Sequence, residues 1–95
     1  MFVFSLTYVK PLSEVERVLP DHVRFLDRYY DLGKFVCSGR KNPRTGGVIL
    51  CAAADATEAE AIMREDPFFI EGIARYEVIE FQPSKYAEAF RAFVS

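Results

Sequence analysis

Hydrophobic residues alternate with other residues in some parts of the chain and recur every three or four positions in others. Alternation is typical of a β-strand, whereas recurrence at three and four positions is typical of an amphipathic helix. Residues 2–9, 34–39, 47–53 and 73–81 have the character of strands. In residues 2–9 both alternating faces carry apolar side chains. This strand is therefore predicted to be central, or to lie in a sheet whose second face meets a partner.

The segment between the first two strands is predicted to form two helices. Ser13 and Glu16 have the spacing of a capping box, which opens a short helix ending near residue 19. Pro20 interrupts the helical pattern, because proline cannot donate a backbone hydrogen bond and clashes with the preceding turn. A main helix then runs from residue 20 or 21 to residue 32, with Gly33 as its C-terminal cap.

A further helix is predicted between the third and fourth strands. Thr57 and Glu60 form a second capping box, which opens a helix that continues to about residue 65. Asp66 ends it, because a residue that precedes proline avoids the helical conformation. After the fourth strand, residues 84–95 have the pattern of a short amphipathic helix.

The order of these elements predicts an α+β fold of the ferredoxin-like, βαββαβ plan. It has a four-stranded antiparallel sheet with the helices on one face, plus a short C-terminal helix. The 95 residues are predicted to form a single domain, with a core of about 1–83 and the C-terminal helix at about 84–95. Hydrophobic residues make up 51% of the chain and aromatic residues 15%, which is rich for so small a domain. We expect a homodimer in which a second copy covers the free face of the sheet.

Composition disfavours several classes of partner. The net charge is −2 with both signs mixed along the chain, and no basic face offers a site for nucleic acid. No apolar run approaches the ~18 residues of a membrane span. The first residues show no basic region before the apolar run, which favours a cytoplasmic location. Cys37 and Cys51 are predicted to be buried free thiols, and with the single histidine they have no zinc-binding spacing.

The first candidate for chemistry is the single histidine, His22, together with Asp66. If the two side chains meet, the carboxylate fixes the imidazole tautomer and favours its protonated form, whereas a helix N-terminus opposes the positive charge. Such a pair suits proton transfer near neutral pH. The structural alternatives stay open, because Asp66 can simply cap the turn that starts at Pro67, and His22 can be an ordinary half-buried residue.

Two further sets of residues offer binding chemistry. Ser38 supplies a hydroxyl, Gly39 allows a close approach to the backbone, and the basic residues that follow suit a carboxylate or a phenolate. The alternative is a solvated turn that carries positive charge. Aromatic side chains could line a pocket for a flat ligand, although aromatics at this spacing are more often core. That aromatic set is Phe2, Phe4, Tyr8, Tyr29, Tyr30, Phe68 and Phe69.

Several short motifs together resemble the YCII-like (YciI) family, within the dimeric α/β-barrel superfamily. They are His22 inside the main helix, the glycine of DLGK, SG at the end of the second strand, GG at the start of the third, and EDPFFIEGI. The resemblance runs to about Pro83. It implies a ferredoxin-like protomer, a homodimer, and an active-site cleft whose histidine and aspartate correspond to His22 and Asp66. The family usually has Gly-Pro after the second strand, where this chain has Gly39 followed by Arg40.

The resemblance implies proton-transfer chemistry on small ring compounds, since relatives include a dehydrochlorinase of a chlorinated hydroxyquinol and the superfamily includes muconolactone isomerases. We therefore expect a cofactor-free isomerase or lyase that acts on a small oxygenated ring compound, and the permanent positive charge of Arg40 favours an anionic one. His22 would be the general acid or base and Asp66 would orient it, with no metal ligand required. Ser38 and Arg40 would hold a substrate oxygen, and Tyr8 and Phe68 would pack the ring.

Two alternatives remain beside the enzyme. One is a non-catalytic small-molecule-binding or interaction module of the same fold. The other is a purely structural dimer, in which His22 and Asp66 do not touch.

Overall fold

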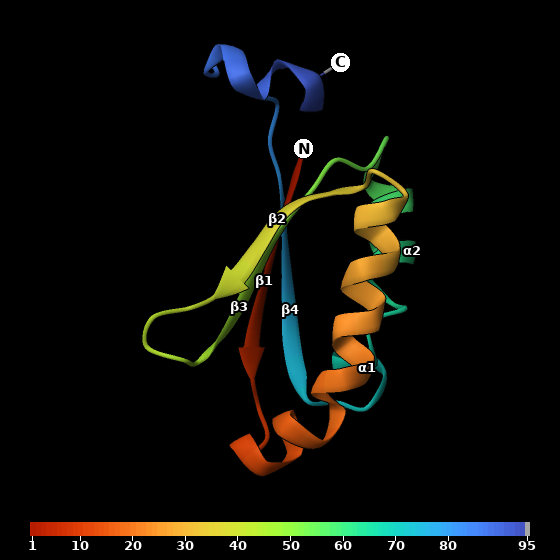
Figure 1. Cartoon of the computed structure of the whole chain (residues 1–95), viewed down its shortest axis with the longest axis vertical. Helices are drawn as coiled ribbons and strands as arrows, with labels where there is room; N and C mark the ends of the chain where they lie inside the picture. Colours follow the sequence, from red (N-terminus) through yellow and green to blue (C-terminus); the bar gives the residue numbers. More distant parts are fainter. Residues whose placement is uncertain (95) are drawn as a thin grey trace.

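The computed structural model describes residues 1–94 and has a four-stranded antiparallel sheet (Figure 1). Its strands are β1 (Phe2–Tyr8), β2 (Phe35–Arg40), β3 (Gly46–Cys51) and β4 (Ala74–Glu80). They lie in the order β2-β3-β1-β4, so β1 is central and pairs with both β3 and β4. The predicted α+β, ferredoxin-like fold is confirmed, and each strand lies within two residues of its expected bounds.

The first helical segment differs from the prediction, because it is one continuous helix, α1 (Leu12–Asp31), with Pro20 inside it. Pro11 precedes its first turn and makes no side-chain cap, so the predicted capping box of Ser13 and Glu16 is wrong. The helix buries a stripe at spacings of three and four residues. That stripe is Val15, Val18, His22, Phe25 and Tyr29.

Burial of this stripe explains why the helix continues through Pro20. A proline in a helix interior costs about 3 kcal/mol. Fully burying each large apolar side chain contributes roughly 1.5–3 kcal/mol, and the stripe has members on both sides of Pro20. His22 consequently lies in the middle of α1 rather than in its first turn. The expected opposition between a helix N-terminus and a charged imidazole does not apply, since that effect fades within one turn.

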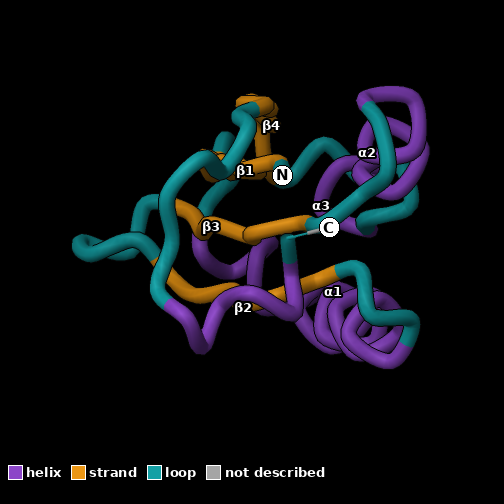
Figure 2. Tube along the Cα trace, turned by 90° about the horizontal axis from the view of Figure 1, so that it is seen from above, coloured by secondary structure: helices purple, strands orange, loops and turns teal. Residues whose placement is uncertain are grey.

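Two shorter helices follow β3. The helix α2 (Ala56–Met63) is capped by Asp55, whose side chain accepts from the backbone N–H of Glu58 at 2.8 Å. The predicted capping box at Thr57 is therefore wrong, because an aspartate two residues earlier already satisfies the first turn. The helix α3 (Pro67–Ile70) begins directly after Asp66. Both α1 and α2 lie on the same side of the sheet (Figures 1 and 2).

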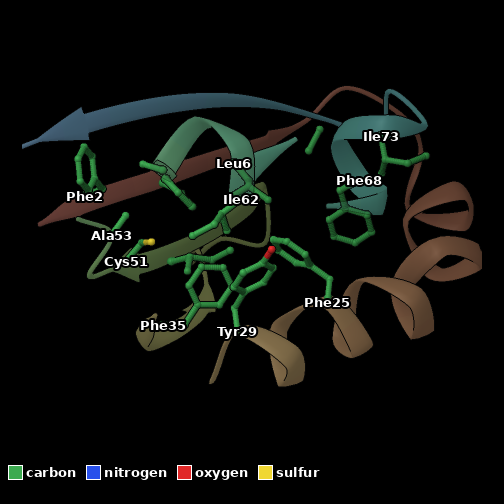
Figure 3. Packing of buried hydrophobic residues seen from close by; sticks show 14 of the residues in the cluster. Phe2, Leu6, Phe25, Tyr29, Phe35, Cys51, Ala53, Ile62, Phe68 and Ile73 are labelled. Atoms are coloured by element: carbon green, nitrogen blue, oxygen red, sulfur yellow. The ribbon is translucent and has the colours of Figure 1, made fainter. Parts of the chain in front are cut away.

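The hydrophobic core lies between the sheet and these helices, and Figure 3 shows its aromatic side chains gathered there. Alternate residues of β1 point into it, and Phe4 has no exposed surface. The intervening residues form the opposite face of the sheet, which no helix of residues 1–94 covers. That face includes four apolar side chains from three strands. They are Val3, Val48, Leu50 and Ile79.

A register shift in β2 decides which of its side chains face the core. Phe35 is paired with Cys51, but the shift occurs between Phe35 and Cys37, and Ser38 is then paired with the buried Ile49. Such a bulge re-aims the residues that follow it. Cys37 therefore lies exposed on the outer face, and the prediction that both thiols are buried is wrong for it.

The last described element, η1 (Glu88–Phe93), is a 3-10 helix rather than an α-helix. None of its residues is buried, and Figure 1 shows it standing beyond the end of the sheet. The predicted C-terminal helix is present in this shorter form, and Ser95 lies outside the described residues. None of the helices of residues 1–94 is long and apolar enough to span a bilayer.

The buried thiol of Cys51 predicts a loss of stability in alkali. Burial raises the pKa of Cys51 to about 11, whereas a thiol in an unfolded chain loses its proton near pH 8.5. Because the unfolded chain binds fewer protons above that pH, the free energy of unfolding should fall by up to about 3 kcal/mol as the pH rises to 11. Urea unfolding between pH 8 and 9 measures this slope below the range in which tyrosines titrate.

Two alanine variants distinguish the contribution of the Cys51 thiol to this pH dependence from the contributions of other groups. Cys51→Ala should flatten the slope, whereas Cys37→Ala, which removes the exposed thiol, should leave it unchanged. An equal slope in the native protein and in Cys51→Ala would show that another group is responsible.

Candidate active site

The structure brings His22 of α1 into contact with Asp66, the residue that caps α3. The distance from His22 Nδ1 to Asp66 Oδ1 is 2.8 Å. Asp66 has no exposed side-chain surface, and the side chain of His22 is only 11% exposed. This contact joins two residues that are 44 positions apart in sequence, and it counts against the purely structural alternative in which they do not meet.

The Asp66 carboxylate accepts hydrogen bonds from three donors. Oδ1 accepts from His22 Nδ1 and also from the backbone N–H of Phe68 at 2.9 Å. Oδ2 accepts from the hydroxyl of Tyr76 on β4. Asp66 is thus a helix cap, as its position before Pro67 suggested, and at the same time the partner of His22. Since the backbone N–H of Phe68 and the hydroxyl of Tyr76 both donate to it, Asp66 has the surroundings of an ionised carboxylate independently of the imidazole.

Tyr76 is the member of this cluster that sequence reasoning missed. It is paired with Leu6 and points to the core side of the sheet. Burial, followed by the Asp66 charge, raises the pKa of Tyr76 far above its usual range, so its hydroxyl stays protonated and donates. The sequence does contain a signal for Tyr76. Its position in the alternation of β4 places it on the core side of the sheet, and a tyrosine there needs a hydrogen-bond partner for its hydroxyl.

The contact with Asp66 fixes the state of the imidazole. An ionised carboxylate can only accept, so Nδ1 carries the proton and Nε2 of the neutral ring is an acceptor. The ring also stacks on Phe68, with centroids 4.1 Å apart and planes within 8°. Among residues 1–94, Nε2 has no hydrogen-bond partner. The arrangement therefore holds one nitrogen lone pair in a fixed orientation, which is what a general base requires.

His22 lines a cavity of about 150 Å³ between α1, α3 and the β2–β3 hairpin. Cavities of about this size accommodate one benzene-sized ring. The predicted substrate-binding residues Tyr8, Ser38, Arg40 and Phe68 all line the same cavity. Asp66 does not line it and lies behind His22. The residues singled out from the sequence are thus gathered at one place.

Ser38 and Arg40 differ in how they are held. The hydroxyl of Ser38 lies 2.7 Å from the hydroxyl of Tyr30 on α1, so each has a partner within the protein. Arg40 is exposed, and its guanidinium makes no hydrogen bond to any residue of the described chain. Both side chains point toward α1 because of the register shift earlier in β2. Within residues 1–94, no group of three or more histidine, cysteine or acidic side chains could hold a metal ion.

Fold and site together define a small ferredoxin-like α+β protein in which a buried histidine–aspartate pair faces a ring-sized cavity. The model of the YCII-related domain matches residues 1–82, and the chain belongs to this family. The resemblance seen in the sequence motifs is thereby confirmed. Comparison with curated protein sequences gives no match.

One similar solved structure is that of 5-chloro-2-hydroxyhydroquinone dehydrochlorinase (TftG) from Burkholderia phenoliruptrix AC1100, in complex with 2,5-dihydroxybenzoquinone. It superposes with a TM-score of 0.72 at 17% sequence identity, and the match covers 94% of this chain and 98% of that chain. At this level of identity the likeness concerns the fold.

Proposed function

We propose that the protein is an enzyme that moves protons on a small oxygenated, anionic ring compound, as an isomerase or a lyase of the dehydrochlorinase type. The observation that carries this proposal is the buried contact between His22 and Asp66, with the remaining imidazole nitrogen beside a ring-sized cavity. The similar dehydrochlorinase is named for a chlorinated hydroxyhydroquinone, which supports an oxygenated ring as the substrate.

In this proposal His22 Nε2 removes a proton from the bound ring, and Asp66 stabilises the imidazolium that forms. For an isomerisation, the same nitrogen returns the proton to another ring atom. For an elimination, chloride leaves with the electron pair of the broken bond, and the proton on His22 passes to water, so the ring loses HCl. Neither path calls for a redox step, and the proposal includes no metal or organic cofactor.

The other residues that line the cavity have positioning roles in this proposal. Ser38 and Arg40 hold an oxygen of the substrate, since a hydroxyl and a guanidinium both donate. Tyr8 and Phe68 pack against the ring, and their own rings lie edge to face with centroids 6.0 Å apart.

Mass analysis of ligands recovered after incubation tests the proposal. The panel comprises chlorinated hydroquinols, unsaturated lactones and ring carboxylates, each incubated with the protein and with His22→Gln as the control. Loss of HCl, or conversion to an isomer of different retention time, supports an enzyme when it requires His22. Binding without any chemical change would instead support the non-catalytic binding module.

We also propose that the protein is a homodimer that buries the outer face of the sheet. The uncovered apolar residues of that face support this, and Val48 and Ile79 are 38% and 47% exposed. Exposed contiguous apolar surface of this kind marks an interface. Sedimentation equilibrium at micromolar concentration tests it, and a monomer there would contradict it.

A further inference from the structure

The charges around the cavity are of one sign. Its only lining side chains with a permanent charge, within residues 1–94, are Arg40 and Arg44, and both belong to the β2–β3 hairpin segment. No aspartate or glutamate lines it, because Asp66 lies behind His22. The hairpin end of the cavity is therefore positive, whereas the rest of the lining is mainly apolar and aromatic.

The Nε–H of Arg44 has no hydrogen-bond acceptor among residues 1–94. Its Nε is buried and lacks a hydrogen-bond partner. Its one contact is from Nη1 to the carboxylate of Glu16 at 3.3 Å, and that glutamate is 63% exposed. Such a long and solvent-screened contact is weak. A buried donor without an acceptor is unfavourable, and a ligand that supplies the acceptor removes this penalty.

The free edge of this guanidinium has the shape of a carboxylate-binding site. Nη1 lies on the side of the group that faces away from the Nε–H, so Glu16 leaves the edge formed by Nε and Nη2 without a partner. Two parallel N–H donors match the two oxygens of a carboxylate, which gives a bidentate and charge-assisted pair. A phenolate or a neutral carbonyl offers only one oxygen to this edge.

We propose that Arg44 binds the carboxylate of the ligand, and that the ligand class is a ring carboxylate. This inference rests on the proposed function and narrows it, since that function requires an anionic ring compound without specifying which group carries the charge. The carboxylate pairs with Arg44 at the hairpin end, and the ring extends along the cavity toward His22. The cavity has room for one ring, so carboxylate and reacting atoms belong to a single small molecule.

The neighbouring basic residues do not offer the same geometry. Arg40 is exposed and contributes positive charge without a buried donor. Lys41 donates to the hydroxyl of Thr7 at 3.2 Å, and an ammonium group cannot form the two parallel bonds. Arg44 is the basic residue here that combines burial, a free donor and a place in the cavity wall.

The test compares benzoate with benzamide, its neutral analogue of the same shape, by NMR titration of the native protein. We expect benzoate to bind at least about tenfold more tightly, as charge-assisted bidentate pairs are the stronger ones. Arg44→Gln should weaken benzoate binding by about tenfold to a hundredfold and weaken benzamide binding much less, because the amide offers only one oxygen to the guanidinium. The matched control is Arg64→Gln, which removes an exposed arginine that pairs with Glu60 on α2 and should change neither affinity.

A second variant tests the inference without altering Arg44. Glu16→Gln removes the carboxylate that contacts Arg44 within residues 1–94, so benzoate affinity should rise by about twofold to fivefold. The inference is overturned if benzoate binds no better than benzamide, if neither binds at millimolar concentration, or if Glu16→Gln and Arg64→Gln behave alike.

These measurements are separate from turnover. Arg44-dependent binding of benzoate, with no ligand of the panel converted, would support this site and count against the proposed enzyme. Conversion of ring compounds that lack a carboxylate, at the native rate in Arg44→Gln, would support the enzyme and overturn the carboxylate site.

Discussion

Replacing Asp66 with alanine is expected to lower the free energy of unfolding by about 3–5 kcal/mol, because three buried donors lose their acceptor together. These donors are His22 Nδ1, the N–H of Phe68 and the hydroxyl of Tyr76. The change also removes the cap of α3, which is worth about 0.5–2 kcal/mol. The total is a large share of the roughly 5–15 kcal/mol that stabilises a domain.

Urea unfolding at neutral pH measures this loss, and two variants divide it into parts. Asp55→Ala removes the exposed cap of α2, whose side chain serves one donor, and should cost about 1 kcal/mol. Tyr76→Phe removes one donor and leaves the carboxylate in place, so its cost should also be about 1 kcal/mol. If Asp66→Ala costs no more than Asp55→Ala, the three contacts do not form the buried cluster described above.

His22→Gln is expected to reduce the turnover number of a converted ring compound by about 10²–10⁴-fold, the usual contribution of a positioned general base. Glutamine keeps an N–H that can donate to Asp66, so the fold should survive while the nitrogen lone pair is lost. Steady-state kinetics should show the loss in kcat rather than in KM, because the substituted group acts on the reacting atoms.

The imidazole itself provides an independent readout. The chain has one histidine, so its ring nitrogens give a single set of ¹⁵N signals. In the neutral ring we expect the proton on Nδ1, held there by Asp66. A neutral ring protonated at Nε2 would contradict the assignment of that nitrogen as the base, as would an unchanged rate in His22→Gln.

The strands were predictable because alternation reports directly on a sheet with one buried face, as in β1, where Phe2, Phe4 and Leu6 are buried. The helices were less so. The rule that proline breaks a helix predicted an end at Pro20. Burial of the apolar stripe of α1 outweighs the cost of this proline, and that burial is known only once the core is assembled. The cap of α2 was missed since Thr57 and Asp55 are both good caps, and the sequence does not say which one precedes the first turn.

The site depended on information beyond local pattern. The pairing of His22 with Asp66 came from the family resemblance, because no spacing rule joins residues so far apart. Simple alternation from Phe35 would have turned Ser38 and Arg40 away from the core, and the register shift in β2 reverses this. Tyr76 was overlooked because its role appears only when β4 lies beside the start of α3.

Because His22 is buried, the hydrogen that it removes from a ligand is expected to exchange slowly with solvent. Nδ1 is committed to Asp66, and the side chain of His22 is nearly enclosed where it lines the cavity, so a proton on Nε2 has little contact with water. When a ring fills that cavity, a hydrogen taken from it stays between the imidazole and the ligand until the ligand leaves. Deuterium placed at the reacting carbon of an isomerised compound would therefore reappear at its new position in the product, with little dilution by the hydrogen of the solvent.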